Sequence, residues 1–142
     1  MSNQNSVLVI SSAYYATLAK KHLQQCEQFL QHSGLTYDIE HVKAGAYELP
    51  AVLLQFEKHR PYRGYLLLGL VLEGSTDHYQ FIWQHLKECF IQYTLQGKFF
   101  GNAIVTASTH ALLTERVEQG HRAKEAVEAL NYLLNLNAKI KL

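Results

Sequence analysis

Side chains that could bind an anion or exchange protons gather in one short segment of the chain. Gly74, Ser75 and Thr76 are followed closely by His78. Backbone N–H groups at a helix start, together with two hydroxyl groups, can hold a phosphate, and a histidine in the first helical turn can act as an acid or base near neutral pH. A turn with an ordinary N-cap and a surface imidazole explains the same residues, so both interpretations stay open.

A second group of candidate residues consists of Glu48 and a pair of tyrosines. Small residues precede Glu48 in the segment 44–50, where they let a ligand approach the backbone. Glu48 can accept hydrogen bonds from hydroxyl groups, although an acidic residue beside a helix N-terminus is the alternative. Tyr14 and Tyr15 can stack on a heterocycle, and packing in the core or in an interface is the alternative for them.

Standard catalytic motifs are missing from the sequence. It contains no G-x-G-x-x-G after the first predicted strand, no G-x-x-x-x-G-K-[ST], no G-x-S-x-G and no H-E-x-x-H. His78 and His85 share one face of a predicted helix, but two histidines do not complete a zinc site. We therefore predict no metal site and no standard nucleotide-binding or hydrolase chemistry.

The composition is that of one globular domain covering residues 1–142. A chain of 142 residues, 48% of them hydrophobic, can bury a core without disulfides or metals. Its net charge of +1, without a block of like charges, argues against nucleic-acid and membrane partners. Cys26 and Cys89 are too few for a disulfide framework, and no apolar run is long enough for a membrane span. We expect a cytoplasmic protein.

The hydrophobic pattern alternates between strand and helix periods. The predicted strands cover residues 7–10, 37–42, 64–72 and 99–106, and the predicted helices cover 19–30, 50–56, 82–93, 109–118 and 121–135. This alternation predicts an α/β fold: a three-layer α/β/α sandwich with a four-stranded parallel sheet, flavodoxin-like. Ligands bind beyond the carboxyl ends of such strands, and both groups of candidate residues follow a predicted strand.

Three segments match a known family in order and in spacing. Residues 45–50 read Gly-Ala-Tyr-Glu-Leu-Pro, and residues 69–79 combine a strand end, a glycine turn and a His-aromatic helix start. The third segment runs from Ile-Val-Thr at 104–106, through Glu115-Arg116, to Gly-His-Arg-Ala-Lys-Glu-Ala at 120–126. Together they resemble the lumazine synthase family over nearly the whole chain.

The resemblance implies a reaction that uses no cofactor. The family condenses 5-amino-6-(ribitylamino)uracil with 3,4-dihydroxy-2-butanone 4-phosphate, so the partners are small-molecule substrates. It implies that His78 is the catalytic proton shuttle. The residues implied to bind the pyrimidine ring and its ribityl chain are Tyr14, Ala46, Tyr47, Glu48, Leu70, Val71, Leu72, Asn102 and Arg122. Those implied to bind phosphate are Gly74, Ser75, Thr76 and Arg116.

The resemblance also implies a homo-oligomer, a pentamer or a multiple of pentamers, with active sites between neighbouring subunits. Asn102, Arg116 and Arg122 would then belong to the adjacent chain. Three positions depart from the family pattern: Asn102 stands where a phenylalanine is usual, Tyr15 replaces a common asparagine, and Glu73 replaces a common arginine. These departures keep open a diverged relative, weakly active or inactive, that binds a flavin or ribityl-pyrimidine or serves as an assembling scaffold.

Overall fold

The computed structural model describes residues 3–74 and 77–142 of the chain, with side chains from residue 5 onward. Ser75 and Thr76, two of the predicted phosphate-binding residues, lie outside the described residues. The elements follow one another as β1 (Asn3–Ser12), α1 (Ala16–His32), β2 (Tyr37–Val42), the 3₁₀ helix η1 (Ala46–Glu48), α2 (Leu49–His59), β3 (Tyr62–Leu72), α3 (His78–Leu95), β4 (Phe100–Ala107), α4 (His110–Gln119) and α5 (His121–Ile140).

The four strands form one parallel sheet in the order β2-β1-β3-β4. The predicted fold class is confirmed. β2 lies on one side of β1 in the sheet, and β3 and β4 lie on the other. The connection that follows β1 and the one that follows β3 therefore run in opposite directions across the sheet, so the strand order reverses between β1 and β3. Such a switch point leaves a crevice at the carboxyl ends of the strands.

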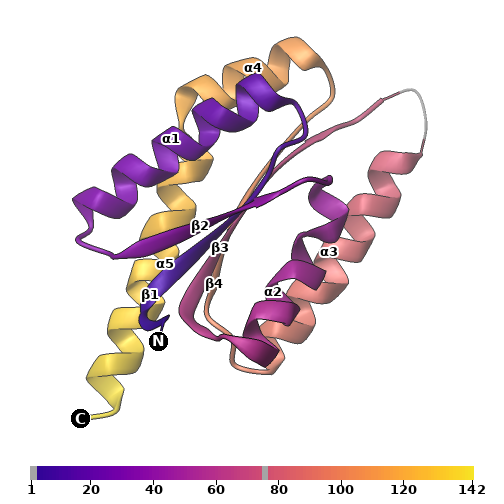
Figure 1. The fold of residues 1–142 in the computed structure, drawn as a ribbon. Helices are drawn as coiled ribbons and strands as arrows, with labels where there is room; N and C mark the ends of the chain where they lie inside the picture. Colours follow the sequence, from indigo (N-terminus) through magenta and orange to yellow (C-terminus); the bar gives the residue numbers. More distant parts are fainter. Residues whose placement is uncertain (1–2, 75–76) are drawn as a thin grey trace.

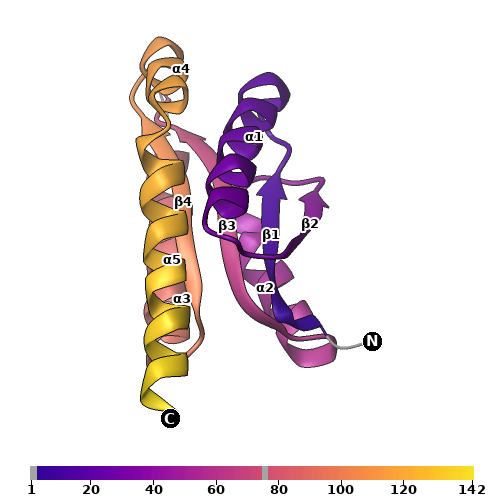
Figure 2. The ribbon, with the colours of Figure 1, turned by 90° about the vertical axis from the view of Figure 1, so that its left-hand side faces the viewer.

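Helices cover both faces of the sheet: Figure 1 shows the strands between α1, α4 and α5 on one side and α2 and α3 on the other, and Figure 2 shows α1, α4 and α5 in front of the sheet. Alternate side chains of β1 point to opposite faces: Val7 and Val9 pack with α1 and α5, whereas Leu8 and Ile10 pack with α2 and α3. A third cluster joins α1 and α4 to the carboxyl ends of β3 and β4. The three layers therefore follow from strands that are apolar on both sides.

β1 is longer than the predicted strand 7–10. Ser11 and Ser12 continue it because they pair with His41 and Val42 of β2, and both serines are buried. At the other end the strand reaches Asn3, with a register shift between Asn3 and Val7. Apolar periodicity detected only the central part, since polar residues at a buried strand end carry no hydrophobic signal.

Local turn chemistry explains where several helices begin or end. Gly34 follows α1 with φ +73, and Gly120 separates α4 from α5 with φ +71, a left-handed conformation that glycine adopts without strain. Pro50 lies in the first turn of α2, where its missing N–H costs nothing. None of the helices in the described parts of the chain combines the length and hydropathy needed to cross a membrane.

Candidate functional site

A cavity of about 540 Å³ opens at the carboxyl ends of β1 and β3, where the sheet order reverses. We call it the switch-point cavity. The segments that form it come from after β1, after β2, from the end of β3 and from the start of α3. Its lining residues are Tyr14, Tyr15, Gly45, Ala46, Tyr47, Glu48, Leu70, Val71, Leu72, His78, Phe81 and Ile82.

The segment with Glu48 lies directly on the sheet because β3 has a glycine beneath it. A Cβ atom at Gly69 would lie 3.0 Å from Cβ of Ala46 and 3.1 Å from a methyl group of Leu49. Ala46 is 4% exposed, whereas Tyr47 is 46% exposed and Glu48 is also exposed. The close approach thus anchors η1 by its first residue and leaves the next two side chains at the cavity.

A buried serine links the two loops on the other side of the cavity. The Ser12 hydroxyl donates a hydrogen bond to the backbone oxygen of Ala44 at 2.6 Å and accepts one from the N–H of Tyr14 at 3.3 Å. The N–H of Ala13 donates to the oxygen of Val42 at 3.0 Å. These bonds hold the loop after β1 against the loop after β2. Sequence analysis did not single out Ser12 and missed this role.

The tyrosine pair stands on a strained turn at the cavity wall. Tyr15 has φ 58, the only positive φ of a non-glycine residue in the described segments, a conformation that costs most residues about 1–2 kcal/mol. Its ring makes edge contacts with the rings of Tyr14 at 5.0 Å and His110 at 6.3 Å. Burial raises the pKa of Tyr15. Tyr14 itself is 60% exposed, so it does not belong to the core of the chain.

The wall opposite the tyrosines comes from the end of β3 and the first turns of α3. Leu70 and Val71 are buried, and Leu72 is half-buried. Asp77 is the N-cap residue of α3, so the helix begins with His78, which is exposed beside the cavity. Phe81 was missed by sequence analysis, although its place three residues after His78 puts it on the same side of a helix.

Arg116 and Arg122 lie in a separate pocket. It measures about 200 Å³ and is formed by the end of β4 with α4 and α5. Arg116 donates a hydrogen bond from Nη1 to the backbone oxygen of Thr106. Arg122 is 3.7 Å from the carboxylate of Glu125, in an exposed pair that adds little stability. The structure brings the two predicted cations together, but in one chain they do not line the switch-point cavity.

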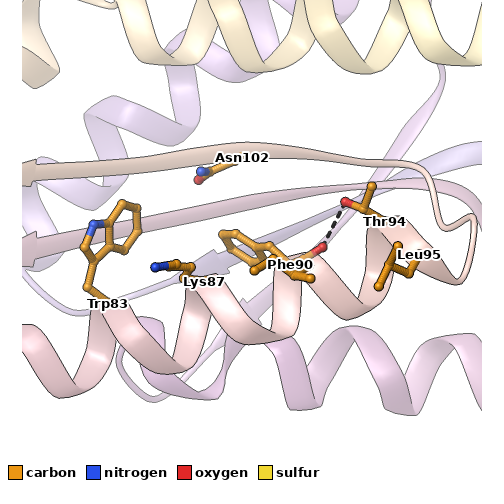
Figure 3. Close-up of a pocket in the computed structure, with 7 residues that line it drawn as sticks. Trp83, Lys87, Phe90, Thr94, Leu95 and Asn102 are labelled. Atoms are coloured by element: carbon orange, nitrogen blue, oxygen red, sulfur yellow. Dashed lines mark hydrogen bonds between the residues drawn. The ribbon is translucent and has the colours of Figure 1, made fainter.

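Asn102 lies in a third place, a groove of about 420 Å³ between α3 and β4. Figure 3 shows it across from the side chains of Trp83 and Phe90 on α3. Its side-chain oxygen accepts a hydrogen bond from the N–H of Ile104 at 3.0 Å. The described residues of the predicted site therefore fall into three pockets of the single chain, except Gly74, which is exposed after the end of β3.

No group of three or more histidine, cysteine, aspartate or glutamate side chains suited to a metal ion occurs within residues 3–74 and 77–142. The polar groups that do meet at the switch-point cavity are the carboxylate of Glu48, the imidazole of His78 and the hydroxyl groups of tyrosines. Such a set can bind hydroxyl-rich ligands, stack on a flat ring and transfer protons.

Known proteins resemble this chain over most of its length. The sequence profile of the 6,7-dimethyl-8-ribityllumazine synthase family matches residues 4–138. The 6,7-dimethyl-8-ribityllumazine synthase of Bartonella bacilliformis is 30% identical, over 83% of this chain and 79% of its own length. The enzyme of the same name from Azorhizobium caulinodans is 30% identical over 94% and 86%, and that of Zymomonas mobilis is 25% identical over 94% and 96%. A profile match over nearly the whole chain means that this chain belongs to the 6,7-dimethyl-8-ribityllumazine synthase family.

Proposed function

We propose that this chain is an active lumazine synthase, which condenses 5-amino-6-(ribitylamino)uracil with 3,4-dihydroxy-2-butanone 4-phosphate. The observation that carries the proposal is the switch-point cavity. It brings Tyr14, Glu48 and His78 together from three segments that are far apart in the sequence. These are the ring-stacking, hydroxyl-binding and proton-transferring groups that the two substrates require.

The cavity suggests how the pyrimidine substrate binds. Its ring stacks on the exposed face of Tyr14, and backbone groups of residues 70–72 meet its polar edge. The ribityl chain runs along Ala46 and Tyr47, where Glu48 accepts hydrogen bonds from its hydroxyl groups. Held in this way, the amine is oriented for attack. The translational and rotational entropy of the substrate is lost when it binds, so this loss does not add to the barrier of the chemical step.

The chemistry then needs only positioning and proton transfer. The pyrimidine amine attacks the ketone and water leaves, which gives an imine. Phosphate is then eliminated, the ring closes and a final dehydration gives the lumazine. His78, exposed at the start of α3 beside the cavity, takes and returns the protons that these steps move.

We propose that the phosphate is bound by the 74–76 turn of one subunit together with Arg116 of its neighbour in a homopentamer. Arg116 and Arg122 share a pocket outside the switch-point cavity of their own chain, which supports a site shared between subunits. Large exposed apolar side chains, among them Phe81, Ile91 and Leu95, are surfaces that an oligomer would cover. We also propose a cytoplasmic location, as the sequence analysis expects.

A second candidate function is ligand binding without turnover. Two observations favour it: Glu73 places an exposed acid next to Gly74 in the proposed phosphate turn, and Asn102 supplies no aromatic ring. An acid beside a bound phosphate weakens its binding by charge repulsion. In that case the switch-point cavity would retain a flavin or a ribityl-pyrimidine.

An assay with both purified substrates separates the two functions. The wild-type protein should produce fluorescent lumazine and release inorganic phosphate in equal amounts. His78→Ala should lower kcat by about 10²-fold or more and leave the Kd for the pyrimidine nearly unchanged. Binding of the pyrimidine by correctly assembled protein, with neither product formed, would replace the enzyme proposal with the second candidate.

A further inference from the structure

His85 stands behind the switch-point cavity, on the far side of Tyr47. The two rings are stacked, with their centroids 3.9 Å apart and their planes inclined by 21°. Tyr47 lines the cavity and His85 does not. The imidazole therefore contacts a residue of the site without facing the space where a ligand would lie.

His85 also has contacts and buried neighbours on its own helix. Cys89, one turn further along α3, has its sulfur 3.8 Å from Nδ1 and 3.9 Å from Nε2 of His85. The neighbouring Leu86 is fully buried, and the hydroxyl of Tyr93 donates a hydrogen bond to the backbone oxygen of Pro50 in α2. These contacts hold α3 against α2, and the imidazole contacts both Tyr47 and Cys89.

Tyr47 itself has few restraints. It lies in the three-residue helix η1, where Ala46 is the buried anchor and the Tyr47 ring remains 46% exposed. Within the described parts of the chain, the Tyr47 ring makes its one contact with another aromatic ring at His85. An exposed tyrosine without such a contact samples several rotamers, whereas a stacked ring occupies one.

We propose that His85 is a positioning residue, which holds Tyr47 in the orientation that shapes the ribityl-binding wall beside Glu48. This inference rests on the proposed function, because it assigns the ribityl chain to that wall. His85 contributes a flat ring at a fixed distance and takes no part in proton transfer. A second aromatic ring in the same place should serve equally well.

The test compares His85→Ala with His85→Phe, and uses Gln84→Ala, an exposed neighbour on α3, as the matched control. His85→Ala should raise the KM and the calorimetric Kd for the pyrimidine by roughly threefold to tenfold, since that is what the loss of one aromatic contact changes. The KM for the butanone phosphate should not change. His85→Phe should restore the wild-type Kd, and Gln84→Ala should match the wild type throughout.

Three outcomes would overturn the positioning role: an unchanged Kd in His85→Ala, an equal rise in both KM values together with a lower unfolding midpoint, or no rescue by phenylalanine. The binding measurement separates this inference from the proposed function. If the protein makes lumazine and neither its KM nor its Kd for the pyrimidine depends on His85, only the positioning role is wrong. Pyrimidine binding that depends on His85 in a protein that makes no lumazine removes only the enzyme proposal.

Discussion

At the residue scale, the side chains that could bind a ligand or transfer protons are exposed, and the residues that position them are buried. Glu48 and His78 are exposed, whereas Ser12 and Ala46 are 2% and 4% exposed. Exposed groups remain available to a ligand, while buried ones lose their freedom to packing and hydrogen bonds. Substitutions of the first kind should therefore change binding or turnover, and those of the second kind should change stability as well.

Gly45 allows a clean test of the cavity wall. It lines the switch-point cavity, its φ is −85, and a Cβ atom there would meet nothing within 4 Å. Gly45→Val should therefore change the free energy of unfolding by less than about 1 kcal/mol. The new side chain would occupy ligand space, so we expect the Kd for the pyrimidine to rise about tenfold or more in calorimetry.

An unchanged Kd in Gly45→Val would place the ligand elsewhere. A large loss of stability would instead mean that Gly45 is needed by the fold, contrary to the open space around it.

At the element scale, the site depends on how closely η1 and α1 lie against the sheet. Gly69 lets η1 lie on β3, as described above, and His22 joins α1 to β4. The ring nitrogen Nε2 of His22 donates to the backbone oxygen of Ala103 at 2.7 Å, and this side chain is 2% exposed. The first contact fixes η1, which lines the switch-point cavity, on β3, and the second fixes α1, which begins after Tyr15, on β4.

Gly69→Ala should separate η1 from β3. Its methyl group would meet the side chains of Ala46, Leu49 and Ile104 at 3.0–3.1 Å, and such overpacking costs about 1–3 kcal/mol of unfolding free energy. Urea denaturation at fixed protein concentration measures this loss, and Gly45→Ala, which meets open space, is the control. Equal stability of the two variants would mean that η1 moves freely and does not define the cavity.

His22 should make the stability of the fold depend on pH. Burial lowers the pKa of His22 below its ordinary 6.5. Below that pH His22 therefore binds a proton more readily in the unfolded chain than in the folded chain. The contribution of neutral His22 to the free energy of unfolding is therefore complete above the unfolded pKa, and it falls as the pH drops below 6.5. His22→Gln keeps an N–H donor for Ala103 but cannot titrate, so its unfolding free energy should fall less steeply with acid between about pH 5 and 7.

Parallel pH profiles of the wild type and His22→Gln, measured by urea denaturation, would show that another group causes the acid sensitivity. His59→Gln, at the end of α2 and exposed, is the matched histidine control.

At the scale of the whole molecule, one chain presents the parts of the proposed site in separate places. The switch-point cavity holds Glu48 and His78, while Arg116 and Arg122 lie by β4, α4 and α5. β4 is an edge strand of the sheet. In the proposed oligomer, a neighbouring subunit that places its switch-point cavity beside this edge would receive these two cations, and a symmetric ring would repeat the contact at every interface.

Mixing two inactive variants tests the shared site. His78→Ala and Arg116→Ala should each lose most activity alone. If the two residues come from different subunits, random reassembly of an equal mixture leaves about a quarter of the sites with both groups intact. We expect that fraction of wild-type activity after joint refolding, with light scattering to confirm the mass of a pentamer or a multiple of it.

Mixtures that stay as inactive as the separate variants, although they form one assembly, would mean that both residues act within one chain. A monomeric mass would reject the shared site directly.

Much of the fold and part of the site follow from the sequence by itself. The alternation of apolar runs and helical stripes predicted the parallel sheet and its two helical layers. The segments that line the switch-point cavity were predicted too, because each follows a strand and parallel strands end at the same edge. These features depend on periodicity and turn chemistry, which are local properties of the chain.

Only the tertiary structure decided which of these residues meet. The closeness of Gly69 to Ala46, the hydrogen bond from Ser12 to Ala44 and the stack of His85 on Tyr47 all join residues from different elements. Such contacts depend on the strand order β2-β1-β3-β4 and on the register of each pair. No local pattern encodes them, because the packing of all the elements together sets the distances between side chains that are remote in sequence.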